Sequence, residues 1–236
     1  MYRALIPNML TSANLVFGMC SILATLRGSL MGGAVFILLA LAADGLDGRA
    51  ARFFGVSSEM GKEMDSLCDL VSFGAAPGIL AYVFCLHEFS FFGWAVAICF
   101  ALCGMWRLAR FNVNVNVVHG YFMGLAIPSG GCFVATSTLL LQATGFDPYR
   151  LGWVYPAIML LVAFLMVSEV HYPDFKGGGE RIFFVSKLVA LIVFAGILYV
   201  GRTAVLPAVF TAIFAAYALF GIVNHVTALT MRTREG

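Results

Sequence analysis

Residues 43–69 have the sequence ADGLDGRAARFFGVSSEMGKEMDSLCD, which holds four of the six aspartates of the chain, Asp44, Asp47, Asp65 and Asp69. Apolar segments long enough to cross a membrane lie on both sides of this stretch. A charge near the centre of a bilayer costs at least about 2.5–3.5 kcal/mol. Four acids at one place therefore require a group that neutralises them.

The spacing of these aspartates indicates what that group is. Asp44 and Asp47 are three residues apart, and Asp65 and Asp69 are four apart, so each pair lies on one face of a helix. Glycine and serine between the pairs favour a turn and a new helix start. Two facing helices would collect four carboxylates, the ligands of hard divalent cations, and paired cations ~3.5–4 Å apart commonly serve displacement at phosphorus. A solvated acidic loop, the alternative, needs no fixed helical spacing.

The same stretch fits the pattern D-x-x-D-G-x-x-A-R-x8-G-x3-D-x3-D without a gap, and it resembles the CDP-alcohol phosphotransferase family. Members of that family move a phosphatidyl group from a CDP-linked lipid to an alcohol and release CMP. The resemblance implies that Asp44, Asp47 and Asp65 bind divalent metal, as two ions of Mg or Mn, with Asp69 also in reach as a ligand. It further implies that Asp69 is the general base for the acceptor hydroxyl.

A pocket for the nucleotide and its phosphates is expected beside these acids. Small side chains there leave room for the nucleotide, and Arg52 adds a cation suited to phosphate. In the N-terminal segment IPNMLTSANLVFG, Asn8, Thr11 and Asn14 recur every three residues and share a helix face. Capping of the helix start is the alternative for Asn8, whereas the amide of Asn14 lies deeper and needs a partner. The predicted nucleotide and phosphate residues are Gly48, Ala51, Arg52, Gly61, Asn8 and Thr11.

Composition places the whole chain in a membrane. Hydrophobic residues make up 61% of the 236 residues, charged residues 11%, and mean hydropathy is +0.95, whereas a soluble domain is about a quarter charged. We expect an all-α integral membrane protein of one domain, residues 1–236, with a six-helix catalytic core over about 1–170 and two additional helices over about 182–226. The eight expected spans are Pro7–Leu26, Leu30–Ala51, Asp65–Leu86, Phe91–Leu108, Phe122–Leu141, Leu151–Val167, Ile182–Val200 and Val205–Val223.

Charge placement predicts how these spans are oriented. With the N-terminus inside, all but three of the 14 Lys and Arg lie on the inner side, the exceptions being Arg27, Arg150 and Arg202. The positive-inside rule then places the acidic stretch on the cytoplasmic side of a cell membrane. The net charge of +2 argues for no particular partner, and no nucleic-acid partner is expected. The family resemblance implies a homodimer.

Two segments bear on the acceptor alcohol. IPNMLTSANLVFG and R-L-A-R-F-N at residues 107–112 resemble the phosphatidylserine synthases within the family. In that interpretation Arg107, Arg110 and Asn112 stand near the acceptor alcohol or a phosphate, and the planar fork of an arginine suits a carboxylate. Ordinary flanking charge with snorkelling stems is the alternative for both arginines.

The resemblance thus implies transfer of the phosphatidyl group from CDP-diacylglycerol to L-serine, giving phosphatidylserine and CMP. The same chemistry with inositol, glycerol 3-phosphate or choline as acceptor is one alternative, because two arginines also suit a phosphorylated alcohol. An ion-coupled transporter is the other, since intramembrane acids often mark ion pathways. Many transporters carry paired repeats, whereas this motif occurs once.

Overall fold

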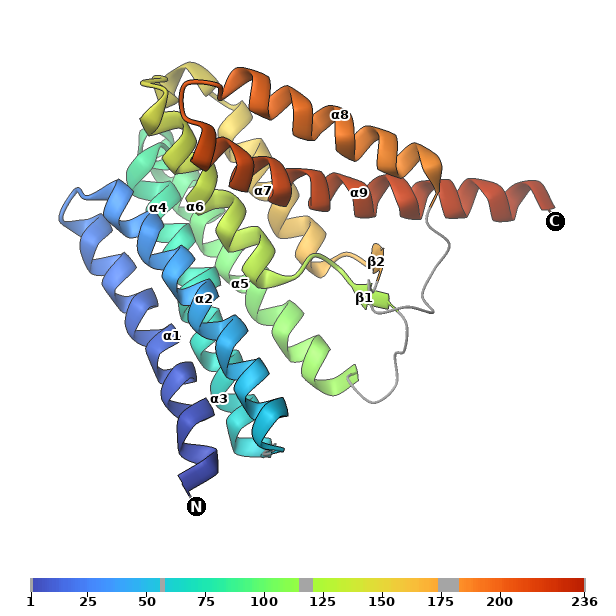
Figure 1. Cartoon of the computed structure of the whole chain (residues 1–236). Coiled ribbons are helices and arrows are strands. Elements are labelled where there is room, and N and C mark those ends of the chain that lie inside the picture. The colour runs from blue at the N-terminus through green and yellow to red at the C-terminus, as the bar shows by residue number, and fades with distance from the viewer. Residues whose placement is uncertain (1, 56–57, 115–120, 174–182, 236) are drawn as a thin grey trace.

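The computed structural model describes residues 2–55, 58–114, 121–173 and 183–235. Figure 1 shows helices packed in one bundle, with a short pair of strands on its flank. The prediction of an all-α membrane protein is therefore confirmed. The elements are α1 Tyr2–Leu26, α2 Leu30–Phe54, α3 Glu59–Asp69, α4 Ala76–Phe84, α5 Ser90–Asn114, β1 Tyr121–Met123, α6 Ile127–Ala143, α7 Val154–Val167, β2 His171–Pro173, α8 Phe184–Val200 and α9 Val205–Glu235, with a π-helical segment at Leu70–Ala75 and 3-10 turns at Leu86–Phe89 and Pro148–Leu151.

An antiparallel pair of helices, α1 and α2, forms one side of the site. The turn between them passes through Gly28, whose φ of 80° suits a residue without a side chain. The helices approach closely, because a Cβ atom at Gly33 would collide with Thr25 Oγ1. α2 ends at Gly55, which has a φ of 62° and donates its backbone N–H to the carbonyl of Arg52. The acidic half of α2 is thereby held beside α1.

The second acidic pair lies on a long continuous helical stretch, Glu59–Phe84, made of α3, the π-helical segment and α4. Ser58 caps its start, since the side chain accepts a hydrogen bond from the Gly61 backbone N–H at 3.0 Å. The sequence predicted this span to begin at Asp65, and the cap moves the start to Glu59. The π-helical segment begins directly after Asp69, and such segments are frequent at functional sites.

The strand pair was not predicted from the sequence, and it connects the bundle to the last helix. β1 runs antiparallel to β2, with Phe122 opposite Tyr172 in the register. The Tyr172 ring is fully buried, its hydroxyl donates to the Ala218 carbonyl oxygen at 3.1 Å, and a Cβ atom at Gly221 would collide with it. The Tyr172 side chain therefore fills the space left open by Gly221 and fixes β2 against α9.

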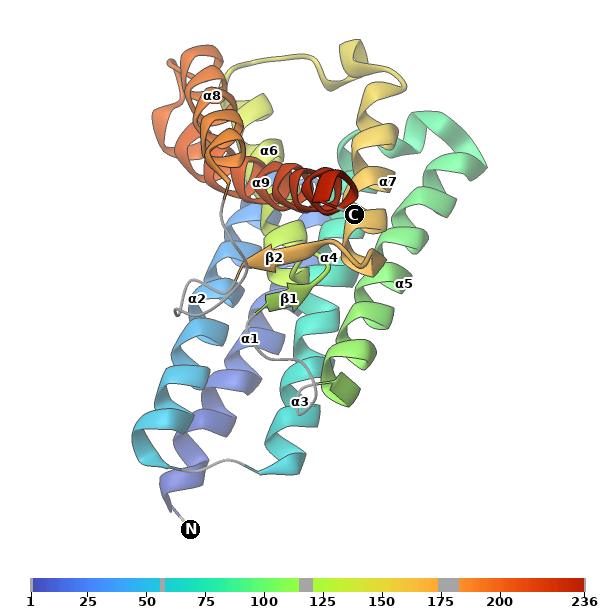
Figure 2. The ribbon, with the colours of Figure 1, turned by 90° about the vertical axis from the view of Figure 1, so that its right-hand side faces the viewer.

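The last two helices run across the others rather than along them, as the two views in Figures 1 and 2 show together. α8 packs on α9, and α9 packs on α6 and β2. The C-terminal part of α9 extends beyond the bundle in Figure 1. α9 also runs on to Glu235, well past the expected end of its span at Val223.

Each of the eight expected spans overlaps a helix within the described residues. The expected span Phe122–Leu141 begins too early, because Phe122 lies in β1 and α6 begins at Ile127, and Ile182, at the start of the seventh expected span, lies outside the described residues. Five stretches of the described chain are long and apolar enough to cross a membrane. The segments at α6, α7 and α8 have 17, 14 and 17 residues, fewer than the roughly 20 that span a bilayer upright. The chain is a multi-pass membrane protein, and the five stretches are Pro7–Leu26, Leu30–Phe54, Glu59–Phe84, Leu86–Val113 and Val205–Ala228.

Candidate active site

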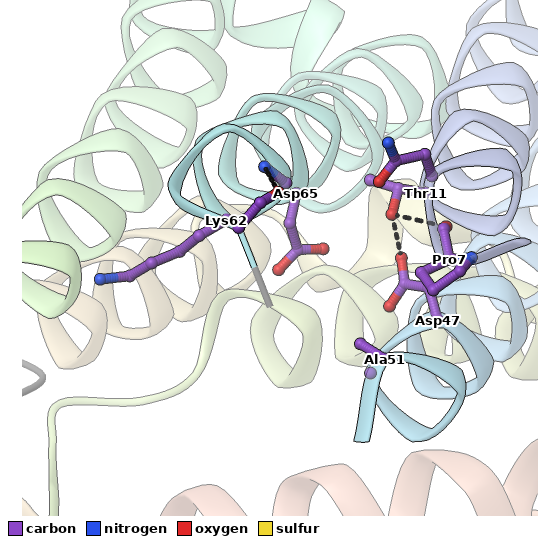
Figure 3. Close-up of a pocket in the computed structure, with 10 residues that line it drawn as sticks. Pro7, Thr11, Asp47, Ala51, Lys62 and Asp65 are labelled. Atoms are coloured by element: carbon purple, nitrogen blue, oxygen red, sulfur yellow. Dashed lines mark hydrogen bonds between the residues drawn. The ribbon is translucent and has the colours of Figure 1, made fainter. Parts of the chain in front are cut away.

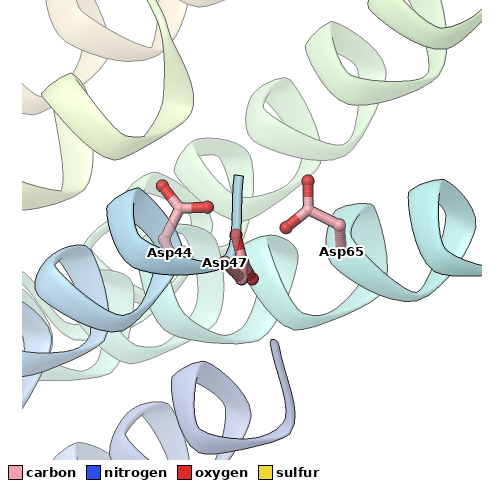
Figure 4. Close-up of side chains that lie close together, drawn as sticks. All are labelled: Asp44, Asp47 and Asp65. Atoms are coloured by element: carbon pink, nitrogen blue, oxygen red, sulfur yellow. The ribbon is translucent and has the colours of Figure 1, made fainter. Parts of the chain in front are cut away.

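Three of the four aspartates converge where α2 faces α3. One carboxylate oxygen from each of Asp44, Asp47 and Asp65 lies within 4.8 Å of the others, and Figure 4 shows the three side chains directed toward a common space. The helical spacing read from the sequence explains this arrangement, because it places Asp44 and Asp47 on the face of α2 that meets α3. Asp69 lies one turn further along the same helix as Asp65 and is buried.

The cluster forms no salt bridge with a basic residue in the described part of the chain. Within the described residues, no Lys or Arg nitrogen lies within 4.0 Å of any of the four carboxylates. Two unit charges of the same sign 4 Å apart repel by about 4 kcal/mol at an effective dielectric constant of about 20. In addition, Asp65 Oδ1 is buried and makes no hydrogen bond in the described part of the chain. A donor set of carboxylate oxygens with one buried oxygen left free fits a hard divalent cation.

Helix α1 supplies polar partners to the acids. The Thr11 hydroxyl donates to Asp47 Oδ2 at 2.7 Å, with the Pro7 carbonyl oxygen 3.1 Å away. One turn along α1, Asn14 Nδ2 donates to Asp69 Oδ1 at 2.9 Å. The sequence predicted that the amide of Asn14 needs a partner, and that partner is the fourth aspartate. The polar face of α1 is therefore turned toward the acidic helices.

A cleft of about 310 Å³ opens beside the cluster, between α1, α2 and α3 (Figure 3). Asp47 and Asp65 line it, and so do five of the six residues predicted for the nucleotide and phosphates. Arg52, the sixth, is not among the lining residues, although a Cβ atom at Gly48 would lie 3.9 Å from Arg52 Nη1. The lining residues are Pro7, Asn8, Thr11, Asp47, Gly48, Ala51, Ser58, Gly61, Lys62 and Asp65.

Sequence reasoning missed Ser58 and Lys62 as lining residues. The sequence indicated Ser58 only as part of the turn between the acidic pairs. In the structure Ser58 caps the start of α3 and lines the cleft. Lys62 Nζ lies 3.4 Å from the Asn112 carbonyl oxygen, and Asn112 Nδ2 donates to Ser66 Oγ at 2.9 Å. These contacts connect α3 to the end of α5. The only signal in the sequence was the position of Lys62 directly after a glycine of the motif.

The two predicted acceptor arginines differ sharply in their surroundings. Arg107 is 8% exposed, its Nε makes no hydrogen bond within the described residues, and its charge interacts with that of Asp69. Its guanidinium carbon also lies 5.1 Å from the centre of the Phe111 ring. Arg110 donates instead to main-chain carbonyl oxygens at the end of α7 and in β1. These belong to Val167 at 2.6 Å, Ser168 at 2.9 Å, and Met166 and Met123 at 3.2 Å each.

The arrangement therefore offers three things at one end of the bundle. There is an anionic triad able to hold a divalent cation, a cleft beside it for a polar group, and a deeper carboxylate, Asp69, flanked by an amide and an arginine. This set suits chemistry on a phosphorylated substrate whose apolar part stays in lipid. The roles predicted for individual residues remain predictions.

Comparison with known proteins agrees with this chemistry. A profile of the family described as CDP-alcohol phosphatidyltransferase matches residues 4–168. A protein of Helicobacter pylori named CDP-diacylglycerol–serine O-phosphatidyltransferase is 35% identical over 173 residues, which is 73% of each chain. One of the same name from Bacillus subtilis is 34% identical over 177 residues, 72% of this chain and 91% of the relative. The archaetidylserine synthase of Methanothermobacter thermautotrophicus is 38% identical over 176 residues, 74% of this chain and 72% of the relative.

The matched region contains α1 to α7, with the acidic triad, the cleft and both arginines. It excludes α8 and α9, which run across the other helices, α9 packing on α6 and β2 and α8 packing on α9. On the strength of this match and of its carboxylate site, the chain belongs to the CDP-alcohol phosphatidyltransferase family.

Proposed function

We propose that this protein transfers the phosphatidyl group of CDP-diacylglycerol to L-serine. In this reaction the serine oxygen forms a bond to phosphorus, the bond from that phosphorus to the CMP oxygen breaks, and phosphatidylserine and CMP result. The observation that carries the proposal is the convergence of Asp44, Asp47 and Asp65 beside a cleft, in a chain of the CDP-alcohol phosphatidyltransferase family. The names of three relatives support serine as the acceptor.

The metal would be held by Asp44, Asp47 and Asp65, with Asp69 as a further candidate ligand. We infer Mg or Mn from the all-carboxylate donor set, and two ions from the family resemblance. When bound, such ions stabilise negative charge on the phosphoryl oxygens and on the departing CMP. Thr11 holds one oxygen of Asp47 in place, which orients that carboxylate.

The proton of the serine hydroxyl would pass to Asp69. This carboxylate lies one helical turn beyond Asp65 and is 7% exposed. Asn14 fixes its orientation through the bond from Nδ2. A base in a place with little water activates the acceptor hydroxyl in preference to water, which keeps hydrolysis of the donor lipid low.

The donor nucleotide would occupy the cleft. Gly48, Ala51 and Gly61 leave the space open, and a Cβ atom at Gly61 would lie only 3.0 Å from Ser58 Oγ. Asn8 and Thr11 present polar groups from the opposite wall. The acyl chains of the donor would remain in lipid, beside helices that are apolar enough to cross the membrane.

Of the two predicted arginines, Arg107 is the better candidate for the serine carboxylate. It is buried, its Nε makes no hydrogen bond to any described residue, and its charge interacts with that of Asp69, which is the base in this proposal. The Arg110 guanidinium already donates to main-chain carbonyl oxygens, and the Asn112 amide already donates to Ser66 Oγ. We therefore assign substrate contact to Arg107 and support of the surrounding backbone to Arg110.

We further propose that the site faces the cytoplasm from a cell membrane, because the basic residues gather on that side of the predicted spans. A homodimer is expected from the family resemblance. Labelling of single introduced cysteines from either side of sealed vesicles tests the orientation, and crosslinking in membranes tests the dimer.

A substrate panel tests the function directly. Purified protein receives CDP-diacylglycerol, Mg or Mn, and one of serine, inositol, glycerol 3-phosphate, choline or ethanolamine, and CMP release is measured. We expect CMP with serine and far less with the others. CMP release with inositol or glycerol 3-phosphate and none with serine would show that the acceptor is not serine, although the protein would still be a phosphatidyltransferase. No release with any of them would remove the proposed function altogether.

A further inference from the structure

Two buried polar atoms without partners in the described part of the chain belong to side chains that interact with Asp69, Asn14 through a hydrogen bond and Arg107 through its charge. Asn14 Oδ1 and Arg107 Nε are both inaccessible, and neither makes a hydrogen bond within the described residues. Asn14 is 0% exposed and Arg107 is 8% exposed. A buried polar group left unpaired costs about 1–3 kcal/mol. Such a cost at two places beside one carboxylate indicates groups that are kept for a ligand.

The orientation of Asn14 follows from its neighbours. A carboxylate only accepts hydrogen bonds, so the atom that faces Asp69 Oδ1 at 2.9 Å is Nδ2. The backbone of Asn14 is also fixed, because Ser72 Oγ donates to its carbonyl oxygen at 2.9 Å. Oδ1 is therefore an acceptor held in a set direction next to the proposed base.

These three groups match the three polar groups of serine. A hydroxyl needs a base, a carboxylate needs a cationic donor, and an ammonium group needs an acceptor. Asp69 and Arg107 serve the first two in the proposed function, which leaves the ammonium group without a partner. Asn14 Oδ1 is the unpaired acceptor at that place. Its neutral oxygen can bind the ammonium without adding a negative charge beside the four acids.

We propose that Asn14 determines acceptor specificity by receiving a hydrogen bond from the ammonium group of the acceptor at Oδ1, while Nδ2 holds Asp69. The inference rests on the proposed function and adds a residue and a selection rule to it. The rule is that an acceptor must carry an amine on the carbon next to the hydroxymethyl group. The competing explanation is that Asn14 only orients Asp69 and does not contact the acceptor.

Two acceptors and two variants separate these accounts. The acceptors are serine and 3-hydroxypropanoate, which keeps the hydroxyl and the carboxylate but lacks the amine. Asn14→Leu has nearly the same shape and removes both polar atoms, whereas Asn14→Asp keeps an acceptor oxygen and removes the donor to Asp69. Ser21→Ala is the matched control, since Ser21 is another fully buried polar residue of α1, two turns away. CMP release gives kcat/KM for each pair.

The parent protein should prefer serine over 3-hydroxypropanoate by roughly ten- to a hundredfold, the worth of one charge-assisted hydrogen bond. Asn14→Leu should erase that preference, because kcat/KM for serine falls further than kcat/KM for 3-hydroxypropanoate. Asn14→Asp should lower both rates and keep the preference. Ser21→Ala should keep both the rates and the preference of the parent.

Three results would overturn the inference. The first is equal kcat/KM for serine and 3-hydroxypropanoate in the parent protein, a measurement that requires no variant. The second is an equal loss with both acceptors in Asn14→Leu, which would show that Asn14 acts only through Asp69. The third is an Asn14→Asp variant that no longer prefers serine over 3-hydroxypropanoate. This result decides the question if Asn14→Leu does not fold. A parent protein that releases no CMP with serine would instead remove the proposed function itself.

Discussion

Replacing Arg107 and Arg110 one at a time should produce two different defects, although the residues are one turn apart on α5. Arg110 makes contacts of 2.6–3.2 Å with four main-chain carbonyl oxygens. A hydrogen bond from a charged group contributes about 1.5–3 kcal/mol. Counting only the two shortest contacts, and taking the lower value because the side chain is half-buried, Arg110→Ala should lower the free energy of unfolding by about 3 kcal/mol.

Arg107→Ala should mainly affect serine. Its Nε has no partner to lose within the described residues, and its guanidinium is the proposed contact of the serine carboxylate. Loss of one such contact corresponds to a roughly ten- to hundredfold rise in the Michaelis constant for serine. The Michaelis constant for CDP-diacylglycerol should change far less. Arg107→Lys should restore little, because an ammonium group offers no planar fork.

The assay combines two measurements on the same detergent-purified samples. Tryptophan fluorescence during unfolding gives stability, and CMP release over a serine titration gives the kinetic constants. The reasoning fails if Arg110→Ala is as stable as the parent but binds serine poorly while Arg107→Ala binds it normally. That result would show that Arg110, rather than Arg107, contacts the serine carboxylate.

Three further predictions concern the metal, the base and the docking of α9. EDTA should abolish CMP release and Mg or Mn should restore it, whereas full activity in a rigorously metal-free sample would exclude a metal role for the triad. Asp69→Asn should lower turnover by roughly 10²–10⁴-fold with CDP-diacylglycerol binding retained, and a decrease of only a few-fold would point to another base. Gly221→Ala should lower the free energy of unfolding by about 1–3 kcal/mol, because the new methyl group collides with the Tyr172 ring. Gly196→Ala on α8 is the control, since a Cβ atom there meets open space, and it should not lower the free energy of unfolding. Equal stability of the two variants would show that Tyr172 does not anchor α9.

Much of the site could be predicted because helical periodicity is a local property. Residues three or four apart share a face wherever the helix lies, so the acidic pairs and the polar face of α1 were visible in the sequence. The requirement for a partner at Asn14 was also visible, because an amide in an apolar segment cannot remain unpaired without cost. The sequence could not identify that partner as Asp69, which lies 55 positions along the chain.

The spacing did not show which acids meet. Four aspartates satisfy the same periodicity, yet Asp44, Asp47 and Asp65 bring one oxygen each within 4.8 Å of the others, whereas Asp69 Oδ1 accepts a hydrogen bond from Asn14 Nδ2. Which oxygens come together depends on how α1, α2 and α3 are placed against one another, which no single helix encodes. Arg107 and Arg110 also differ through tertiary contacts, since Arg107 is buried and its charge interacts with that of Asp69, whereas Arg110 donates to carbonyl oxygens at the end of α7.

The sequence by itself determined that this protein is a helical membrane protein with a motif for transfer of a phosphatidyl group. Hydropathy decides where helices cross lipid, and fixed spacing decides which side chains share a face. Only the tertiary structure decided that α8 and α9 run across the others, that β1 pairs with β2, and that Lys62 joins the cleft. These features depend on contacts between segments far apart in the chain, where close packing and the pairing of buried polar groups select one arrangement.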